Sequence, residues 1–131
     1  MWGNFQKVLD TIKVSLKLRS LRHQMLSSNI ANVDTPGYRR KDISFERVMQ
    51  MYLSQERKLK VTDKRHFSFR ERTLEDLTRT SESMTLGTPN NVSLEEEMVN
   101  LTENQLLYES TLQALSKELE RLKEIITEGG R

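Results

Sequence analysis

Cysteine is absent from this sequence, and proline and glycine are scarce, with two and five residues among 131. The lack of cysteine excludes a disulfide framework and any thiol-based site, and it fits a reducing compartment as well as an oxidising one. The scarcity of Gly and Pro permits long helices. No stretch approaches about 18 consecutive apolar residues, so we expect no membrane-spanning helix. The amino-terminal segment lacks an unbroken apolar core, so we expect no cleavable signal peptide.

Apolar residues are also few, at 35% of the chain against 31% charged residues. In a chain with the length of one modest domain, this composition predicts a core that is small or shared with other chains. Signatures of catalysis are missing too: there is no Gly-rich phosphate loop, no H-E-x-x-H and no supported Ser-His-Asp arrangement. His23 and His66 stand apart from any ligand cluster. We therefore expect no enzyme activity, no cofactor and no metal site.

The charge is unevenly distributed along the chain. Residues 1–50 carry nine Lys or Arg and four acidic residues, a net charge of +5, whereas residues 92–131 carry four and nine, a net charge of −5. The two ends are therefore electrostatic complements. The net charge of +2 for the whole chain argues against a general nucleic-acid binder. The basic run at 39–41, beside Tyr38, is better interpreted as a solvated or subunit-pairing patch than as a phosphate site.

An amphipathic helix is predicted from about Asn4 to Ile30 or Ala31, within an amino-terminal segment of residues 1–31. Its apolar stripe has alternating steps of four and three residues, at Phe5, Leu9, Ile12 and Leu16. The stripe then shifts around the helix, to Leu18, Leu21 and Met25.

A rigid reversal is predicted after this helix. Pro36 disfavours helical backbone at Thr35, and Pro36 and Gly37 suit the second and third positions of a type II turn. Asn32 is suited to left-handed backbone at the helix end, and Asn29 shares its helix face.

Two segments follow with weaker patterns. Within residues 32–50, the apolar run after the turn fits a short strand as well as a helical turn. Residues 51–91 are highly charged, and their pattern is compatible with loops, short strands or partial disorder.

The clearest pattern is a coiled-coil seam within residues 92–131. Apolar residues recur there with strict four-three spacing over more than four heptads, which predicts a long helix. The one polar seam residue, Gln105, would fix the register of the pairing if it were buried. Ser93 and Glu96 form a capping box, and the glycines at 129–130 end the helix. The seam positions are Leu94, Met98, Leu101, Gln105, Tyr108, Leu112, Leu115, Leu119, Leu122 and Ile126.

These elements predict a mainly α protein. The long terminal helices would pair antiparallel as a coiled coil, joined by the Thr-Pro-Gly-Tyr turn and a short irregular or β-containing middle segment. Sparse apolar stripes offset little of the conformational entropy that is lost when both helices become ordered. Exposed ion pairs between the oppositely charged ends add only tenths of a kcal/mol each. We therefore expect both ends to complete their folding by packing against neighbouring subunits.

The stretch SSNIANVDTPGYRRKDISF, residues 27–45, resembles the signature of bacterial flagellar axial proteins, in which Ala-Asn, two residues, Thr-Pro-Gly-Tyr and a basic residue follow one another. The carboxy-terminal helix is also similar to that of the family, with a Glu-Met start at Met98 and a tyrosine at Tyr108. The residues that match the signature are Ala31, Asn32, Thr35, Pro36, Gly37, Tyr38 and Arg39.

Length narrows this resemblance to the proximal rod proteins, because distal rod and hook subunits carry additional β domains between the same two ends. The ENQLLYES run and the ending LKEIITEGGR are more similar to the FlgB type than to the FlgC type, whose last helix usually carries a Tyr-Glu-Ala-Asn type segment. Here Tyr108 and Glu109 are followed by Ser110 and Thr111.

The resemblance implies a structural subunit of the flagellar basal-body rod in the periplasm, exported unfolded by the flagellar type III apparatus. The implied partners are copies of the chain, other rod subunits of the FlgC type, and proteins of the membrane ring and its adaptor. The turn would set the angle between the first helix and the segment after it. Two alternatives remain from the residues alone: a coiled-coil adaptor or export chaperone, and a nucleic-acid binder acting through residues 39–41.

Overall fold

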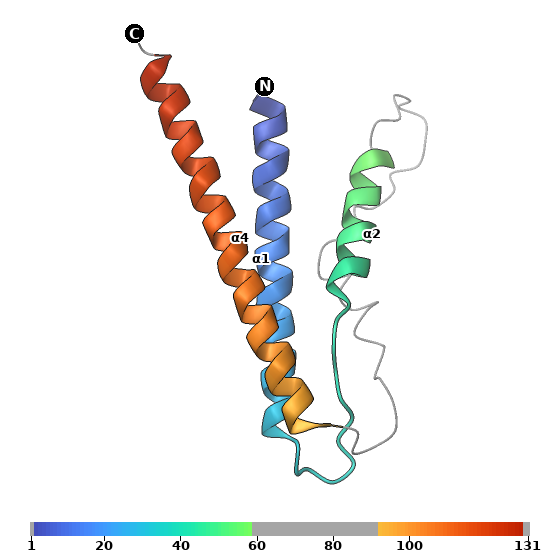
Figure 1. Ribbon diagram of the computed structural model, residues 1–131. Coiled ribbons are helices and arrows are strands. Elements are labelled where there is room, and N and C mark those ends of the chain that lie inside the picture. Colours follow the sequence, from blue (N-terminus) through green and yellow to red (C-terminus); the bar gives the residue numbers. More distant parts are fainter. Residues whose placement is uncertain (1, 59–91, 130–131) are drawn as a thin grey trace.

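Three helices make up the described part of the chain, which comprises residues 2–58 and 92–129 of the computed structural model (Figure 1). Helix α1 spans Trp2–Ala31, α2 spans Phe45–Lys58 and α4 spans Leu94–Glu128. The prediction of a mainly α protein is thereby confirmed, and α1 and α4 are in extensive contact. Among these described helices, none is both long enough and apolar enough to cross a membrane.

The turn after α1 has the predicted type II features. The Tyr38 amide donates to the Thr35 carbonyl at 3.2 Å, which closes a four-residue turn. Pro36 supplies the fixed φ of the second position, and Gly37 in the third position has a φ of 76°. Residues with a Cβ rarely adopt that backbone conformation, so the turn itself requires the glycine.

Helix α2 shows that the apolar run after the turn is helical from Phe45 onward, whereas residues 42–44 precede the helix. Its apolar residues recur at the i, i+3, i+4 and i+7 positions of one helix face, namely Phe45, Val48, Met49 and Tyr52. Residues 51–58, which the sequence placed in the less patterned middle region, form the second half of this helix. The rest of that region, 59–91, lies outside the described residues.

A small core forms where α2 and the segment before it pack against α1. Leu18, Ile43 and Val48 are buried at its centre, and Leu21 and Met25 are among the half-buried residues around them. The second stripe of α1, which the sequence places to one side of the first, therefore faces α2. The core accounts for few side chains, as the low apolar content predicts.

Helix α4 begins and ends near its predicted caps. The Ser93 hydroxyl accepts a hydrogen bond from the Glu96 amide at 3.5 Å, and three glutamates lie in the first turn, where the helix dipole favours negative charge. At the other end the Gly129 amide donates to the Ile125 carbonyl at 2.9 Å. Gly129 is the C-cap residue and has a φ of −72°, so this glycine itself is not in the left-handed conformation.

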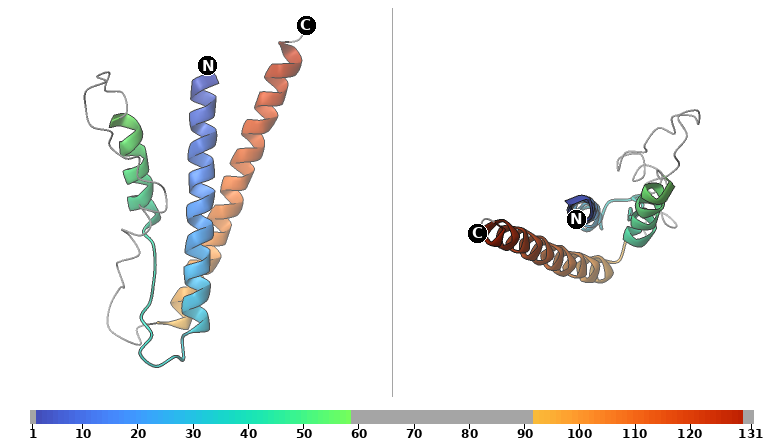
Figure 2. Two further views of the ribbon diagram at one scale, coloured as in Figure 1. Left: turned by 180° about the vertical axis from the view of Figure 1, so that it is seen from behind. Right: turned by 90° about the horizontal axis from the view of Figure 1, so that it is seen from above.

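Helices α1 and α4 run antiparallel and are not equally close along their length. Figure 1 shows the end of α1 beside the start of α4 at the base of the molecule, next to the turn. Toward the two chain termini the helices diverge, which the views from behind and from above in Figure 2 also show. The base is therefore the part of the pair that a single chain packs most completely.

The turn glycine gives the first testable prediction. Replacing Gly37 with Ala should destabilise the chain by about 1 kcal/mol, because a residue with a Cβ is strained in this left-handed backbone conformation. The loss should not be larger, since nothing lies within 4 Å of the added Cβ and no clash results. The Gly37→Asn variant should lose clearly less, since asparagine tolerates this conformation. Urea unfolding followed by circular dichroism measures both, and equal losses would contradict the backbone explanation.

Candidate functional site

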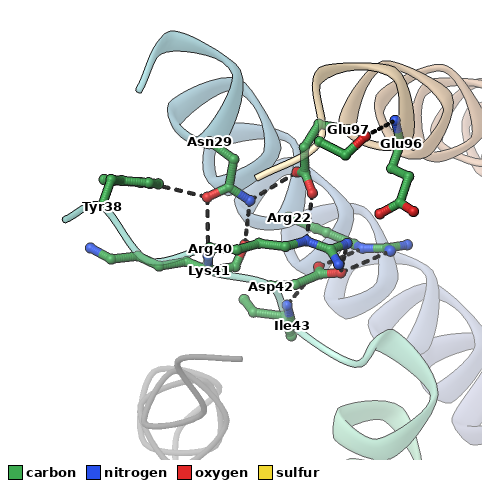
Figure 3. A network of polar contacts seen from close by, with 10 residues as sticks. Arg22, Asn29, Tyr38, Arg40, Lys41, Asp42, Ile43, Glu96 and Glu97 are labelled. Carbon is green, nitrogen blue, oxygen red and sulfur yellow. Dashed lines mark hydrogen bonds and ion pairs between the residues drawn. The ribbon is translucent and has the colours of Figure 1, made fainter. Parts of the chain in front are cut away.

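A buried asparagine joins three segments at the base of the molecule (Figure 3). Asn29, near the end of α1, has no exposed surface. Its amide nitrogen donates to the Lys41 carbonyl at 2.7 Å and to Glu97 Oε2 at 2.9 Å. Its amide oxygen accepts from the Lys41 amide and from the Tyr38 hydroxyl, both at 3.0 Å. All four hydrogen-bonding positions of the side chain are thus used, so neither its position nor its orientation can change without loss.

Glu97 is the second buried member of this group, and it comes from the first turn of α4. Its side chain has no exposed surface, yet it carries the charge of a carboxylate next to two donors. One oxygen accepts from Asn29, and the other forms an ion pair of 2.5 Å with Arg40 Nε. Burial of a charge is tolerated only with such partners, so the start of α4 is fixed to the end of α1 and to the chain after the turn.

A second ion pair continues the network toward α1. Arg22 approaches Asp42 with two nitrogens, Nε to Oδ1 at 2.9 Å and Nη2 to Oδ2 at 3.3 Å. Asp42 also accepts from the Ile43 amide at 2.7 Å, and Arg40 Nη2 lies 3.7 Å from Asp42 Oδ2. The side-chain hydrogen bond with Asp42 raises the pKa of Arg22 above its ordinary value. The bidentate geometry ties the segment after the turn to the second half of α1.

Arg19 and Asn104 connect α1 and α4 at a point farther from the turn than Asn29 and Glu97. The Asn104 side chain is buried and donates to the Arg19 carbonyl at 2.9 Å. The Arg19 guanidinium lies over the Phe45 ring, 3.9 Å from its centre, and thereby contacts α2 as well. Burial, followed by the nearby positive charge of Arg22, lowers the pKa of Arg19 below its ordinary value.

The residues of the predicted turn motif are divided between the network and the surface. Asn29 is buried in the network, Tyr38 and Asn32 are half-buried, and the others are exposed. Asn32 Nδ2 donates to the Ser28 carbonyl at 2.8 Å, and its oxygen accepts from the Thr35 hydroxyl at 3.2 Å, which stabilises the turn from within. The exposed members of the motif are Ala31, Thr35, Pro36, Gly37 and Arg39.

Sequence reasoning missed the charged members of the network, Arg22, Arg40, Asp42 and Glu97. Arg40 belongs to the basic run at 39–41, for which the sequence indicates a solvated or subunit-pairing patch. Its side chain instead reaches Glu97 of the same chain, and the other two residues of the run are exposed. Glu97 is one of three consecutive acids at a helix start, where the helix dipole favours negative charge whatever its partners. A signal was nevertheless present, because Glu97 lies seven residues before Asn104 and both occupy the side of α4 that faces α1.

The predicted seam of α4 is only partly covered by α1. Four of its positions, seven residues apart, are half-buried: Leu101, Tyr108, Leu115 and Leu122. The other six are exposed: Leu94, Met98, Gln105, Leu112, Leu119 and Ile126. Gln105 donates to Glu109 at 3.3 Å on the surface, and Asn104 beside it is the polar residue buried against α1. On α1, the predicted positions are half-buried: Phe5, Leu9, Ile12 and Leu16.

The arrangement serves to fix helices and offers no chemistry beyond that. Within residues 2–58 and 92–129 no group of three or more His, Cys, Asp or Glu is placed to hold a metal ion. The Glu97 carboxylate and the Asn29 amide are buried and face internal partners, as described above, and so do not present a reactive group to a substrate.

The buried ion pair gives a prediction with an internal control. The Glu97→Gln variant should lose about 3 kcal/mol of folding free energy, since it removes the charge that compensates Arg40 and disturbs the bond to Asn29. The Glu96→Gln variant makes the same chemical change at an exposed neighbour in the same helical turn and should stay within about 0.5 kcal/mol of the parent. Thermal and urea unfolding of both variants measure the difference; similar losses would contradict the role given to Glu97.

Comparisons of the sequence with known proteins identify its family. The family model described as flagella basal body rod protein matches residues 16–39, which include the end of α1 and the turn. The flagellar basal body rod protein FlgB of Bacillus subtilis is 26% identical over 95% of this chain and 97% of its own length. FlgB of Yersinia enterocolitica is 30% identical over 88% of this chain and 90% of its own. FlgB of Escherichia coli is 29% identical over 88% of this chain and 89% of its own length. The chain therefore belongs to the FlgB family of flagellar basal body rod proteins.

Proposed function

We propose that this structural rod subunit polymerises through its terminal helices and connects the membrane ring and its adaptor to the distal rod. Its partners would be further copies of the chain, rod subunits of the FlgC type and the ring and adaptor proteins. It would reach the periplasm through the flagellar type III export apparatus without a cleaved signal. The subunit acts as a mechanical element, so the proposal assigns it no catalysed reaction and no cofactor.

The observation that carries this proposal is the amount of apolar surface left on α4. Large apolar side chains normally lie inside a monomeric protein or form a binding surface when they gather on one side of an element. Here several of them follow the heptad spacing of a coiled-coil seam without a partner in the chain. The exposed fractions are 43% for Leu94, 55% for Met98, 41% for Leu112, 49% for Leu119 and 64% for Ile126.

The base of the molecule supports the same proposal from the other side. The network around Asn29 and Glu97 fixes the directions of α1 and α4 relative to the turn, so each subunit would present its helices to neighbours at a defined angle. The exposed turn residues Thr35, Pro36, Gly37 and Arg39 would then lie at one end of the subunit, where they can contact the next one (Figure 1). A rigid base with incompletely packed helices is the shape expected of a polymerising element.

The proposal predicts that the isolated chain is incompletely folded. In dilute solution the helix content of the purified chain should fall below that of the described helices, and it should rise with concentration, because neighbouring copies supply the missing contacts. Circular dichroism across a concentration series, with limited proteolysis at each end, measures this. A fully helical, protease-resistant dimer at every concentration would instead favour the export-chaperone alternative.

Deletion of the gene in its own bacterium tests the function directly. Cells without the chain should lack assembled rods and be non-motile, and a plasmid copy of the parent sequence should restore both. Electron microscopy of isolated basal bodies and spreading in soft agar measure the two results. Motile deletion cells with complete rods would contradict the proposal, whereas salt-sensitive binding of the chain to nucleic acid would support the alternative based on residues 39–41.

A further inference from the structure

Helix α4 carries two heptad seams that share one column of residues. The inner seam faces α1 of the same chain. The positions that belong to this seam alone lie seven residues apart, and each is buried or half-buried: Glu97, Asn104, Thr111 and Glu118. The outer seam is the one predicted from the sequence. The positions that belong to it alone are exposed: Met98, Gln105, Leu112, Leu119 and Ile126. Both seams include the half-buried column of Leu101, Tyr108, Leu115 and Leu122. One helix can therefore pack against two others, one on each side of the shared column.

The two seams differ in chemistry. All four positions specific to the inner seam are polar, and two of them make the hydrogen bonds to Asn29 and to the Arg19 carbonyl. Those specific to the outer seam are apolar except for Gln105, although they lie at the surface of the single chain. The polar positions of the inner seam specify one pairing of the helices rather than strengthen it. The apolar positions of the outer seam are costly to expose to water unless another helix covers them.

We propose that the outer seam binds α1 of a neighbouring copy, so that each α4 lies between its own α1 and the α1 of the next subunit. This proposal rests on the polymerising function proposed above and names the surface that performs it. The outer seam is continuous with the contact inside the chain through the shared column. A neighbouring α1 would thus extend an interface that already exists rather than create a separate one.

Charge identifies α1 as the occupant. Helix α4 contains nine acidic and three basic residues, a net charge of −6, whereas α1 contains five Lys or Arg and one Asp, a net charge of +4. Two α4 helices would repel each other along their length, and an α1 helix is attracted. The amino-terminal half of α1 also exposes apolar side chains, with Trp2 at 67% and Val8 at 43%. These residues lie on the part of α1 that diverges from α4 of its own chain (Figure 2).

Cross-linking tests the contact, because the absence of cysteine makes engineered thiols unambiguous. Two differently tagged chains, one carrying only Val8→Cys and the other only Leu119→Cys, are co-expressed, and basal bodies are isolated and treated with a short bismaleimide. With one thiol per chain, a product carrying both tags must join two copies. The control pairs Val8→Cys with Ser110→Cys, which lies on the opposite side of α4. We expect the first pair to give several-fold more product than the control, and equal yields would overturn the proposal.

A matched pair of substitutions separates this inference from the function on which it rests. Leu112→Glu places a charge in the outer seam, and Gln113→Glu places the same residue at the next, also exposed, position outside both seams. Leu112→Glu should weaken subunit association at least about tenfold and abolish motility, because it removes a buried leucine from the interface. Gln113→Glu should leave motility unchanged. In dilute solution, where the chain is not associated, circular dichroism of both purified variants should match the parent, since neither side chain contacts the base; only at high concentration should Leu112→Glu gain less helix than the parent.

The outcomes distinguish two failures. If the parent sequence restores motility to deletion cells and Leu112→Glu does so equally well, the assignment of the outer seam is overturned while the rod function stands. If both glutamate variants abolish motility alike, the outer seam has no special role and the assignment is likewise overturned. If the parent sequence itself fails to restore motility in its own bacterium, the rod function is overturned together with the inference.

Discussion

A buried carboxylate at the start of a helix is the constraint on which the rest of this structure depends. Glu97 has no exposed surface, and its charge is compensated by Arg40 and by the amide of Asn29, a residue 68 positions away in the sequence. A buried charge without its partners costs several kcal/mol, so the three residues occupy their places together or not at all. One joint therefore fixes the end of α1, the exit of the turn and the first turn of α4. A shift of α4 by one residue would move Glu97 away from both partners, so the joint also fixes the helix register.

The strength of this joint contrasts with the other end of the molecule. Toward the termini, α1 and α4 diverge, and their apolar residues are half-buried or exposed (Figure 2). A globular protein of this size would normally place its best packing in the centre and let its ends fray. Here the best packing lies at one end, beside the turn. That distribution suits a subunit whose shape is set at a single joint and whose helices are completed by other molecules.

Local signals explain what the sequence predicted well. Pro36 and Gly37 impose a turn through their own backbone preferences, the capping box at Ser93 acts over three residues, and heptad spacing needs only one helix to be visible. The charged network has no such local signature. Arg22, Arg40 and Glu97 resemble ordinary surface charges until the fold brings them together, and the helical pattern of α2 was hidden by its short length and by the charged residues around it. The side of α4 that faces α1 was obscured in the same way, because two overlapping seams fit the same heptad spacing and the positions specific to the inner one are polar.

That ambiguity is informative, because contacts inside a chain and contacts between chains face different demands. Two helices of one chain are held at a high effective concentration, so their contact needs little strength and gains most from polar groups that admit only one register. A neighbouring copy must overcome the loss of translational and rotational freedom on association, which requires buried apolar area. Helix α4 divides its surface in this way, with Glu97 and Asn104 on the inner seam and Leu112 and Leu119 on the outer one. If the outer seam binds a neighbouring copy as proposed, it is the more conspicuous of the two in the sequence because the contact between chains is the harder one to form.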